Sequence, residues 1–218
     1  MRLQGRKLSA TKSENQTPVT GENLASREPS ETRFLFGFLL LAGLLAFAVR
    51  ILPHAPNFTP MGAFALFAGA YLAPKFKWAF FLPLLVMFLS DIFIGFYDLK
   101  LMAVVYAGFL LYAAIGVLVS KKRSAAAILL GSIGGAVFFY LTTNFAVWAF
   151  SSWYPHTLEG LLLSYTLALP FFRATLLGDI VFTGIFFGVY AFAKNFLLDK
   201  RILVSPGLKE QLWKTSKT

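Results

Sequence analysis

Between Phe34 and Lys194 the chain consists of long apolar blocks separated by short polar or proline-containing breaks. A helix crosses the hydrocarbon of a bilayer with about 20 apolar residues. Blocks near this length cover residues 34–52, 59–73, 76–96, 101–119, 125–150 and 171–193. The pattern predicts an all-α integral membrane protein, built as a bundle of six transmembrane helices.

Two segments do not fit this spacing cleanly. The block 59–73 is only about 22 Å long as a helix, so it either spans with little tilt or enters the membrane partway. Thr59 is expected to be its N-cap, with Pro60 in the first turn. The apolar stretch 157–170 is separated from the last span by Pro170 and Arg173, which favours an interfacial or re-entrant segment.

Composition agrees with a membrane domain. A hydrophobic content of 57% and a mean hydropathy of +0.68 exclude an ordinary soluble domain. We predict a disordered polar cytoplasmic tail over residues 1–33, a membrane domain over 34–194 and a basic cytoplasmic tail over 195–218. The absence of cysteine excludes disulfides, thiolate metal sites and a Cys nucleophile.

Positive charge orients the predicted bundle. Seventeen of the 20 Lys and Arg fall on one side of the six-span arrangement, and cytoplasmic loops collect such residues. The N-terminus and the C-terminus are therefore both predicted to be cytoplasmic. Because the net charge of +10 lies in short clusters between apolar blocks, it indicates topology, and no nucleic acid partner is expected.

Four ionisable residues lie inside or at the edges of the apolar blocks: Arg50, Asp91, Arg173 and Asp179. A charge in hydrocarbon is costly and persists mainly where it is paired or faces a polar cavity. Helical rise places Asp91 about 9 Å and Asp179 about 12 Å below the outer ends of their spans, with Asn144 at a similar depth.

This shared depth predicts a pocket open to the outside that binds a small molecule. Helical spacing places Tyr140, Asn144 and Trp148 on one face, and Thr175 and Asp179 on another. The expected lining residues are Asn57, Thr59, Asp91, Asn144, Trp148 and Asp179, with Arg50 and Arg173 as charge partners or anion contacts.

Plainer interpretations of the same residues remain open. Asp91 with Arg50, and Asp179 with Arg173, are equally typical of structural ion pairs, and Trp148 is more typical of an interfacial belt. The two histidines match no metal-binding motif, so neither a metal nor a cofactor is expected.

Small residues repeat at four-residue spacing on several of the predicted helices. The pairs are Ala42 with Ala46, Gly131 with Gly135, and Gly184 with Gly188. This pattern is typical of close helix packing, and we expect it to serve packing before partner binding.

Several segments carry a family resemblance. They are the run from Pro53 to Pro60 followed by Gly62 to Ala70, then Ser90-Asp91, Asn144 to Trp148, and Pro170-Phe171-Phe172 leading to Leu176 to Asp179. Over about residues 36–194 the chain resembles small bacterial membrane proteins of undetermined function. These are themselves similar to the substrate-binding S components of energy-coupling factor (ECF) transporters.

The resemblance implies a protein of the bacterial inner membrane that captures a small solute from outside. It also implies a transmembrane coupling protein and separate ATPase subunits as partners, with Ala42 and Ala46 on the surface facing the coupling protein. The chain contains no Gly-x4-Gly-Lys-Ser/Thr phosphate loop, so any ATP-driven transport needs those subunits. No vitamin-binding signature is present, and the solute is therefore not inherited from the resemblance.

Two other functions remain open. One is a structural or scaffold membrane protein without a ligand. The other is an intramembrane aspartyl enzyme, because Tyr97-Asp98 and Gly178-Asp179 look slightly like paired catalytic aspartates. Leu177 occupies the position where that enzyme family has its first glycine, and the expected protein is not an enzyme.

Overall fold

The computed structural model describes residues 27–203, with side chains over 31–196. Within this range the chain is helical, and turns and short connections join the helices. The elements are α2 (Arg27–Ile51), α3 (Met61–Tyr71), the 3-10 helix η1 (Lys77–Phe81), α4 (Leu82–Ile94), α5 (Leu99–Ser120), α6 (Ala125–Phe150) and α7 (Leu158–Leu203). The all-α prediction is confirmed for this part of the chain.

Five helical segments of the described chain are long and apolar enough to cross a membrane: Glu31–Ile51, Lys77–Ile94, Leu99–Ser120, Ala125–Phe150 and Leu158–Phe196. The protein is therefore a multi-pass membrane protein. The predicted block 59–73 is the sixth helix, α3, which has 11 residues and is about 16 Å long, half the thickness of the hydrocarbon.

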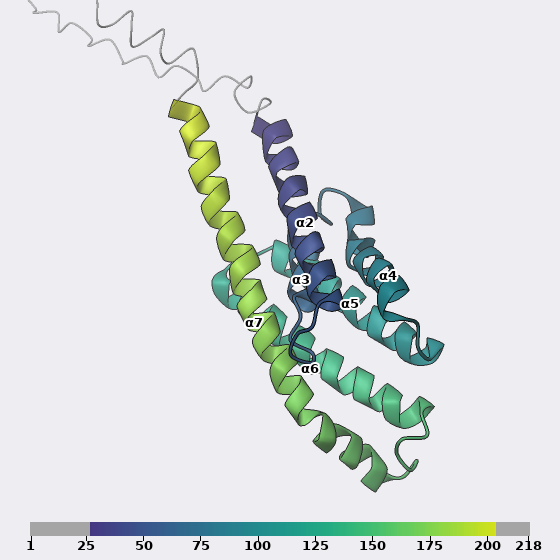
Figure 1. Ribbon diagram of the computed structural model, residues 1–218. Helices are drawn as coiled ribbons and strands as arrows, with labels where there is room; N and C mark the ends of the chain where they lie inside the picture. The colour runs from purple at the N-terminus through teal and green to yellow at the C-terminus, as the bar shows by residue number, and fades with distance from the viewer. Residues whose placement is uncertain (1–26, 204–218) are drawn as a thin grey trace, which may run out of the picture.

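Helix α3 lies at the centre of the bundle. Every residue from Met61 to Ala70 is buried, and the helix packs mainly against α5 and then α7. Figure 1 shows it enclosed among the longer helices. A helix that is apolar on all sides belongs in a protein core, so α3 is apolar because it is surrounded by protein.

The short helix still carries the chain from one end of the bundle to the other. The ring of Phe36, near the start of α2, lies 5.3 Å from the ring of Phe76, just after α3. The Arg123 Nη2 donates to the Ala70 carbonyl at 3.0 Å, so the α5–α6 connection lies at the C-terminal end of α3. We call this end the basic end, because Lys75, Lys77 and Lys121 to Arg123 belong to it.

Both described ends of the chain lie at the basic end. Glu31 near the start of α2 forms an ion pair with Lys194 of α7 at 3.3 Å, and Phe34 stacks on Tyr190. In Figure 1 the start of α2 and the end of α7 point the same way. Successive connections therefore still alternate between the two ends of the bundle, although α3 is short. That the basic end faces the cytoplasm stays a prediction.

Three predicted boundaries change. Helix α2 begins at Arg27, so the last part of the polar segment predicted to be disordered is helical, and residues 1–26 lie outside the described range. Helix α7 runs from Leu158 through Pro170 without interruption, which joins the predicted lead-in to the last span. It also extends to Leu203, into the predicted basic tail, of which 204–218 lie outside the described range.

Local signals set the ends of the other helices. Asp98 caps α5 by accepting hydrogen bonds from the backbone N–H groups of Lys100 and Leu101, at 2.9 and 3.0 Å. Ser124 caps α6 in the same way through Ala127. Gly95 ends α4 with φ of 101°, a conformation that favours glycine.

Arg123 holds the C-terminal end of α3, and we expect its loss to be measurable. Its guanidinium lies 4.5 Å from the centre of the Tyr71 ring in addition to its bond to Ala70. Arg123→Ala should lower the free energy of unfolding by about 1–2 kcal/mol. Unfolding in one detergent measures this, and Lys122→Ala, at an exposed neighbour, should stay within about 0.5 kcal/mol of the wild type.

Candidate functional site

Arg50 and Asp91 form an ion pair between α2 and α4, in which Asp91 is buried and Arg50 is partly buried. Asp91 is 1% exposed, and its second oxygen accepts a hydrogen bond from the Tyr106 hydroxyl at 2.7 Å. The Arg50 Nε also donates to the Ser90 hydroxyl at 2.7 Å. The pair thus joins three helices, because Tyr106 belongs to α5, and this matches the structural interpretation of these two residues.

Asp179 on α7 is 2% exposed and has different partners from those predicted. The Tyr112 hydroxyl of α5 donates to one of its oxygens, and the Ala63 backbone N–H of α3 also donates to the carboxylate. The expected ion pair with Arg173 is wrong: Arg173 is exposed and has no ion pair with any described residue.

The carboxylate of Asp179 caps the N-terminus of α3 from a neighbouring helix. The residue before α3 is Pro60, which forms no side-chain capping bond, so the prediction that Thr59 caps this helix is wrong. A methyl group on Gly62 would lie 2.3 Å from an oxygen of Asp179, so only glycine permits this approach. The negative carboxylate then meets the positive end of the α3 dipole.

Trp148 and Thr59 have contacts elsewhere than in the pocket. The Trp148 indole N–H donates to the Pro155 carbonyl at 3.0 Å, and its ring meets His156 edge-on, which fixes the α6–α7 connection. Thr59 belongs to the segment that packs against Gly178 of α7. Neither residue lines the pocket described next.

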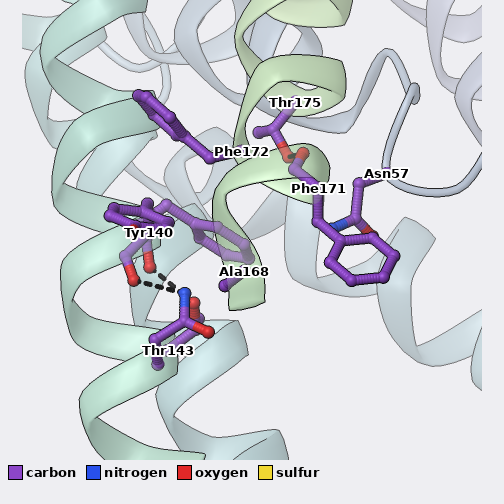
Figure 2. A pocket seen from close by; sticks show the side chains of 9 residues that line it. Asn57, Tyr140, Thr143, Ala168, Phe171, Phe172 and Thr175 are labelled. Carbon is purple, nitrogen blue, oxygen red and sulfur yellow. Dashed lines mark hydrogen bonds between the residues drawn. The ribbon is translucent and has the colours of Figure 1, made fainter. Parts of the chain in front are cut away.

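A small open pocket lies between α6, α7 and the connection from α2 to α3. Its volume is about 120 Å³. In Figure 2 Asn57 approaches from the connection, Tyr140 and Thr143 from α6, and Ala168, Phe171, Phe172 and Thr175 from α7. The remaining lining residues are Phe139 and Asn144. Of the eight predicted site residues, the structure brings Asn57 and Asn144 together here.

Most polar groups of this pocket already have partners within the protein. The Tyr140 hydroxyl donates to the Tyr165 carbonyl at 2.7 Å, and Thr143 and Thr175 donate to carbonyls one turn earlier on their own helices. The Asn144 Nδ2 donates to the Tyr140 carbonyl at 2.8 Å, which leaves its Oδ1 and its second N–H open. The exposed Asn57 side chain forms no hydrogen bond within the described chain.

The pocket contains residues that the sequence did not single out. Phe139, Thr143 and Ala168 have no distinguishing signal in an apolar helix, and Phe171 and Phe172 entered only through the family resemblance. Tyr140 and Thr175 were placed on the correct helix faces by their spacing from Asn144 and Asp179. Tyr112, the partner of Asp179, was missed, although a tyrosine in mid-span is a signal for a buried polar contact.

The sequence comparison covers most of the membrane domain. A family of unknown function, DUF6580, matches residues 30–201. The chain belongs to this family. No curated protein and no solved structure matches it. The site of this DUF6580 member must therefore be argued from its own geometry.

The surface proposed for a coupling partner is not available in this DUF6580 chain. Ala42 and Ala46 are 4% and 0% exposed, so both face the interior of the bundle. Gly43 beside them packs against Phe64 and Val86 of the same chain. The small residues of α2 therefore serve packing within the bundle, which is the role expected for small residues at four-residue spacing.

The two aspartates considered for an enzyme have separate environments. Asp98 caps α5 in an exposed connection, whereas Asp179 is buried against α3 and Tyr112. Two carboxylates that share a proton must face each other closely. No hydrogen bond joins these two in the described chain, and we derive no catalytic step from them.

Proposed function

We propose that the protein is a solute-binding membrane protein of transporter type, which holds a small uncharged molecule in the pocket between α6, α7 and the α2–α3 connection. The carrying observation is that Asn57 and Asn144, from distant parts of the chain, line one open pocket. The amide of Asn57 and the Oδ1 and second N–H of Asn144 form no hydrogen bond within the described chain. Amides offer both donors and acceptors, and they can orient a solute that lies against apolar walls.

The lining favours a neutral solute. None of the nine lining residues is Lys, Arg, Asp or Glu. The charged residues predicted for the site are either paired elsewhere, as Arg50 and Asp91 are, or lie outside the pocket, as Asp179 and Arg173 do. An ion would therefore enter this pocket without a counter-charge, which is unfavourable in a membrane domain.

The size of the pocket limits the solute. An engineered cavity of about 150 Å³ holds one benzene molecule, so 120 Å³ holds a molecule or molecular fragment of about five non-hydrogen atoms. The rings of Tyr140 and Phe172, whose centres are 4.7 Å apart, offer an apolar wall for it. A planar group with one hydrogen-bonding edge fits both the wall and the amides.

The proposal keeps the transport class implied by the resemblance to ECF S components. In this arrangement the basic end faces the cytoplasm of a bacterial inner membrane and the pocket opens to the outside. Two features support this orientation: the arrangement of the basic residues, and the position of Asn57 at the end of the bundle opposite to Lys75. Separate ATPase subunits energise transport, if it is coupled to ATP at all, and their docking surface lies elsewhere than on Ala42 and Ala46.

Asn144→Ala tests the proposal. We expect the variant to retain its melting temperature and to lose about tenfold in affinity, the cost of one hydrogen bond to a bound solute. Native mass spectrometry of the protein, mildly extracted and then exposed to cell extract, measures retained small molecules. Thr142→Ala is the matched control, because the Thr142 side chain lies close to Asn144 in the sequence but forms hydrogen bonds only with carbonyls of its own helix.

The scaffold alternative gives a different result in the same experiment. The fully paired Arg50–Asp91 network favours it, since such a network stabilises a bundle without any ligand. A wild-type protein that retains no small molecule after exposure to extract would support the scaffold and reject the pocket. Equal retention in Asn144→Ala and the wild type would reject the assigned site.

A further inference from the structure

The two aspartates inside the membrane domain differ in counter-charge. Asp91 faces the guanidinium of Arg50. Asp179 is as deeply buried as Asp91, yet no Lys, Arg or His of the described chain forms an ion pair with it. A buried carboxylate without a cation is the kind of group that takes up a proton, because the neutral form avoids the cost of burying charge.

The surroundings of Asp179 stabilise the charged form as well. The Tyr112 hydroxyl and the Ala63 backbone N–H both donate to the carboxylate, and the N-terminus of α3 contributes its positive dipole. After protonation the carboxyl becomes neutral and gains an O–H donor, while the dipole loses its opposing charge. Both protonation states are therefore accommodated, and they differ in how firmly they hold α3.

The same carboxylate is connected to the pocket by two routes. Thr175 lines the pocket and lies one helical turn before Asp179 on α7. Gly178, next to Asp179, packs against the backbone of Phe58 and Thr59, where an added methyl group would lie 3.4 and 3.3 Å away. The pocket residue Asn57 directly precedes these two residues and has a left-handed φ of 61°.

We infer that Asp179 is an exchangeable proton-binding site that transmits its protonation state to the pocket through Phe58, Thr59 and Pro60. The proton comes from water, binds a carboxylate oxygen and returns to water, so no other group is consumed. This inference stands independently of the solute, because it concerns the proton and the α3 cap alone.

Few titratable groups near Asp179 could take up the proton in its place. The α5 side contributes Tyr112 as its titratable group, and the residues that meet Asp179 from α3, Gly62 and Ala63, carry none. On the next turn of α7, Thr183 donates to Ser132 of α6, and neither ionises near neutral pH. A change in protonation at this place is therefore assigned to Asp179 itself.

Raising the pH is expected to charge Asp179 and to tighten the cap on α3. Lowering the pH neutralises the carboxyl, weakens its attraction to the helix terminus and loosens the segment that carries Asn57. Asp179→Asn keeps an acceptor for the Ala63 N–H but has no charge, so at every pH the variant should behave as the wild type does at low pH. By linkage, anything that holds Asn57 in place would also change the proton affinity of Asp179 by the same factor.

Infrared difference spectroscopy of the full chain in lipid nanodiscs, between about pH 5 and pH 9, tests the proton site. We expect a protonated-carboxyl band that disappears as the pH rises, is absent from Asp179→Asn and is shifted in Tyr112→Phe. Asp98→Asn, at the exposed cap of α5, is the matched control and should keep the band. A wild-type spectrum without a pH-dependent carboxyl band, or a band unchanged in Asp179→Asn, would overturn the inference.

A fluorescent label tests the connection to the pocket. The chain has no cysteine, so Ala55→Cys in the exposed connection provides a single attachment site. We expect the emission of an environment-sensitive label to follow the infrared band in the wild-type background and to lose its pH response in the Asp179→Asn background. An equal response in both backgrounds would show that the carboxyl is not coupled to this segment.

Discussion

Asp91→Ala is expected to lower the free energy of unfolding by about 3–5 kcal/mol, because it leaves the Arg50 guanidinium inside the bundle without its counter-charge. The substitution also removes the acceptor of the Tyr106 hydroxyl. Reversible unfolding in mixed micelles, followed by the loss of helical circular dichroism, measures the change. The expected value exceeds that of any loss of a single neutral hydrogen bond.

Two further variants separate charge pairing from packing. Tyr106→Phe removes one hydrogen bond and should cost about 1 kcal/mol. Combining Arg50→Met with Asp91→Leu replaces the pair by apolar side chains and should recover most of the loss, because no charge then remains buried. If the double variant were as unstable as Asp91→Ala, the loss would come from packing and not from an orphaned charge.

The apolar pattern predicted which segments are helical better than it predicted whether each helix contacts lipid or is enclosed by protein. The blocks later found as α2, as η1 together with α4, as α5 and as α6 have about the expected length, because lipid contact requires about 20 apolar residues. The block at α3 is apolar for another reason, since it is enclosed by other helices. Hydrophobicity alone does not distinguish a helix surrounded by lipid from one surrounded by protein, so the pattern did not indicate that α3 is enclosed.

The site was harder to predict than the fold. Helical rise gives the depth of Asp91 and Asp179 but not the direction in which each side chain points. Arg50 and Asp91 were correctly considered as a pair, whereas Asp179 lies beside an uncharged partner, Tyr112. Charge patterns indicate possible ion pairs, but they give no signal for a carboxylate that caps a neighbouring helix.

Gly116→Ala is expected to cost about 3 kcal/mol, since overpacking costs most where the contacting atoms cannot move. A methyl group on Gly116 would lie 2.2 Å from the Leu66 carbonyl oxygen of α3, and one on Gly69 would lie 2.0 Å from the Ala113 carbonyl oxygen of α5. Both contacts are with backbone, so the two helices must separate to make room. Thermal unfolding in one lipid composition measures the single variants and the double variant.

The glycine pair on α7 provides the matched control. Gly184 and Gly188 were expected to serve packing, but a methyl group at either would meet nothing within 4 Å in the described chain. Replacing them by alanine should leave stability unchanged or raise it by up to about 1 kcal/mol, the difference in helix propensity. The same substitution thus has opposite consequences on α5 and α7, because only on α5 does the missing side chain let a buried half-length helix approach backbone to backbone.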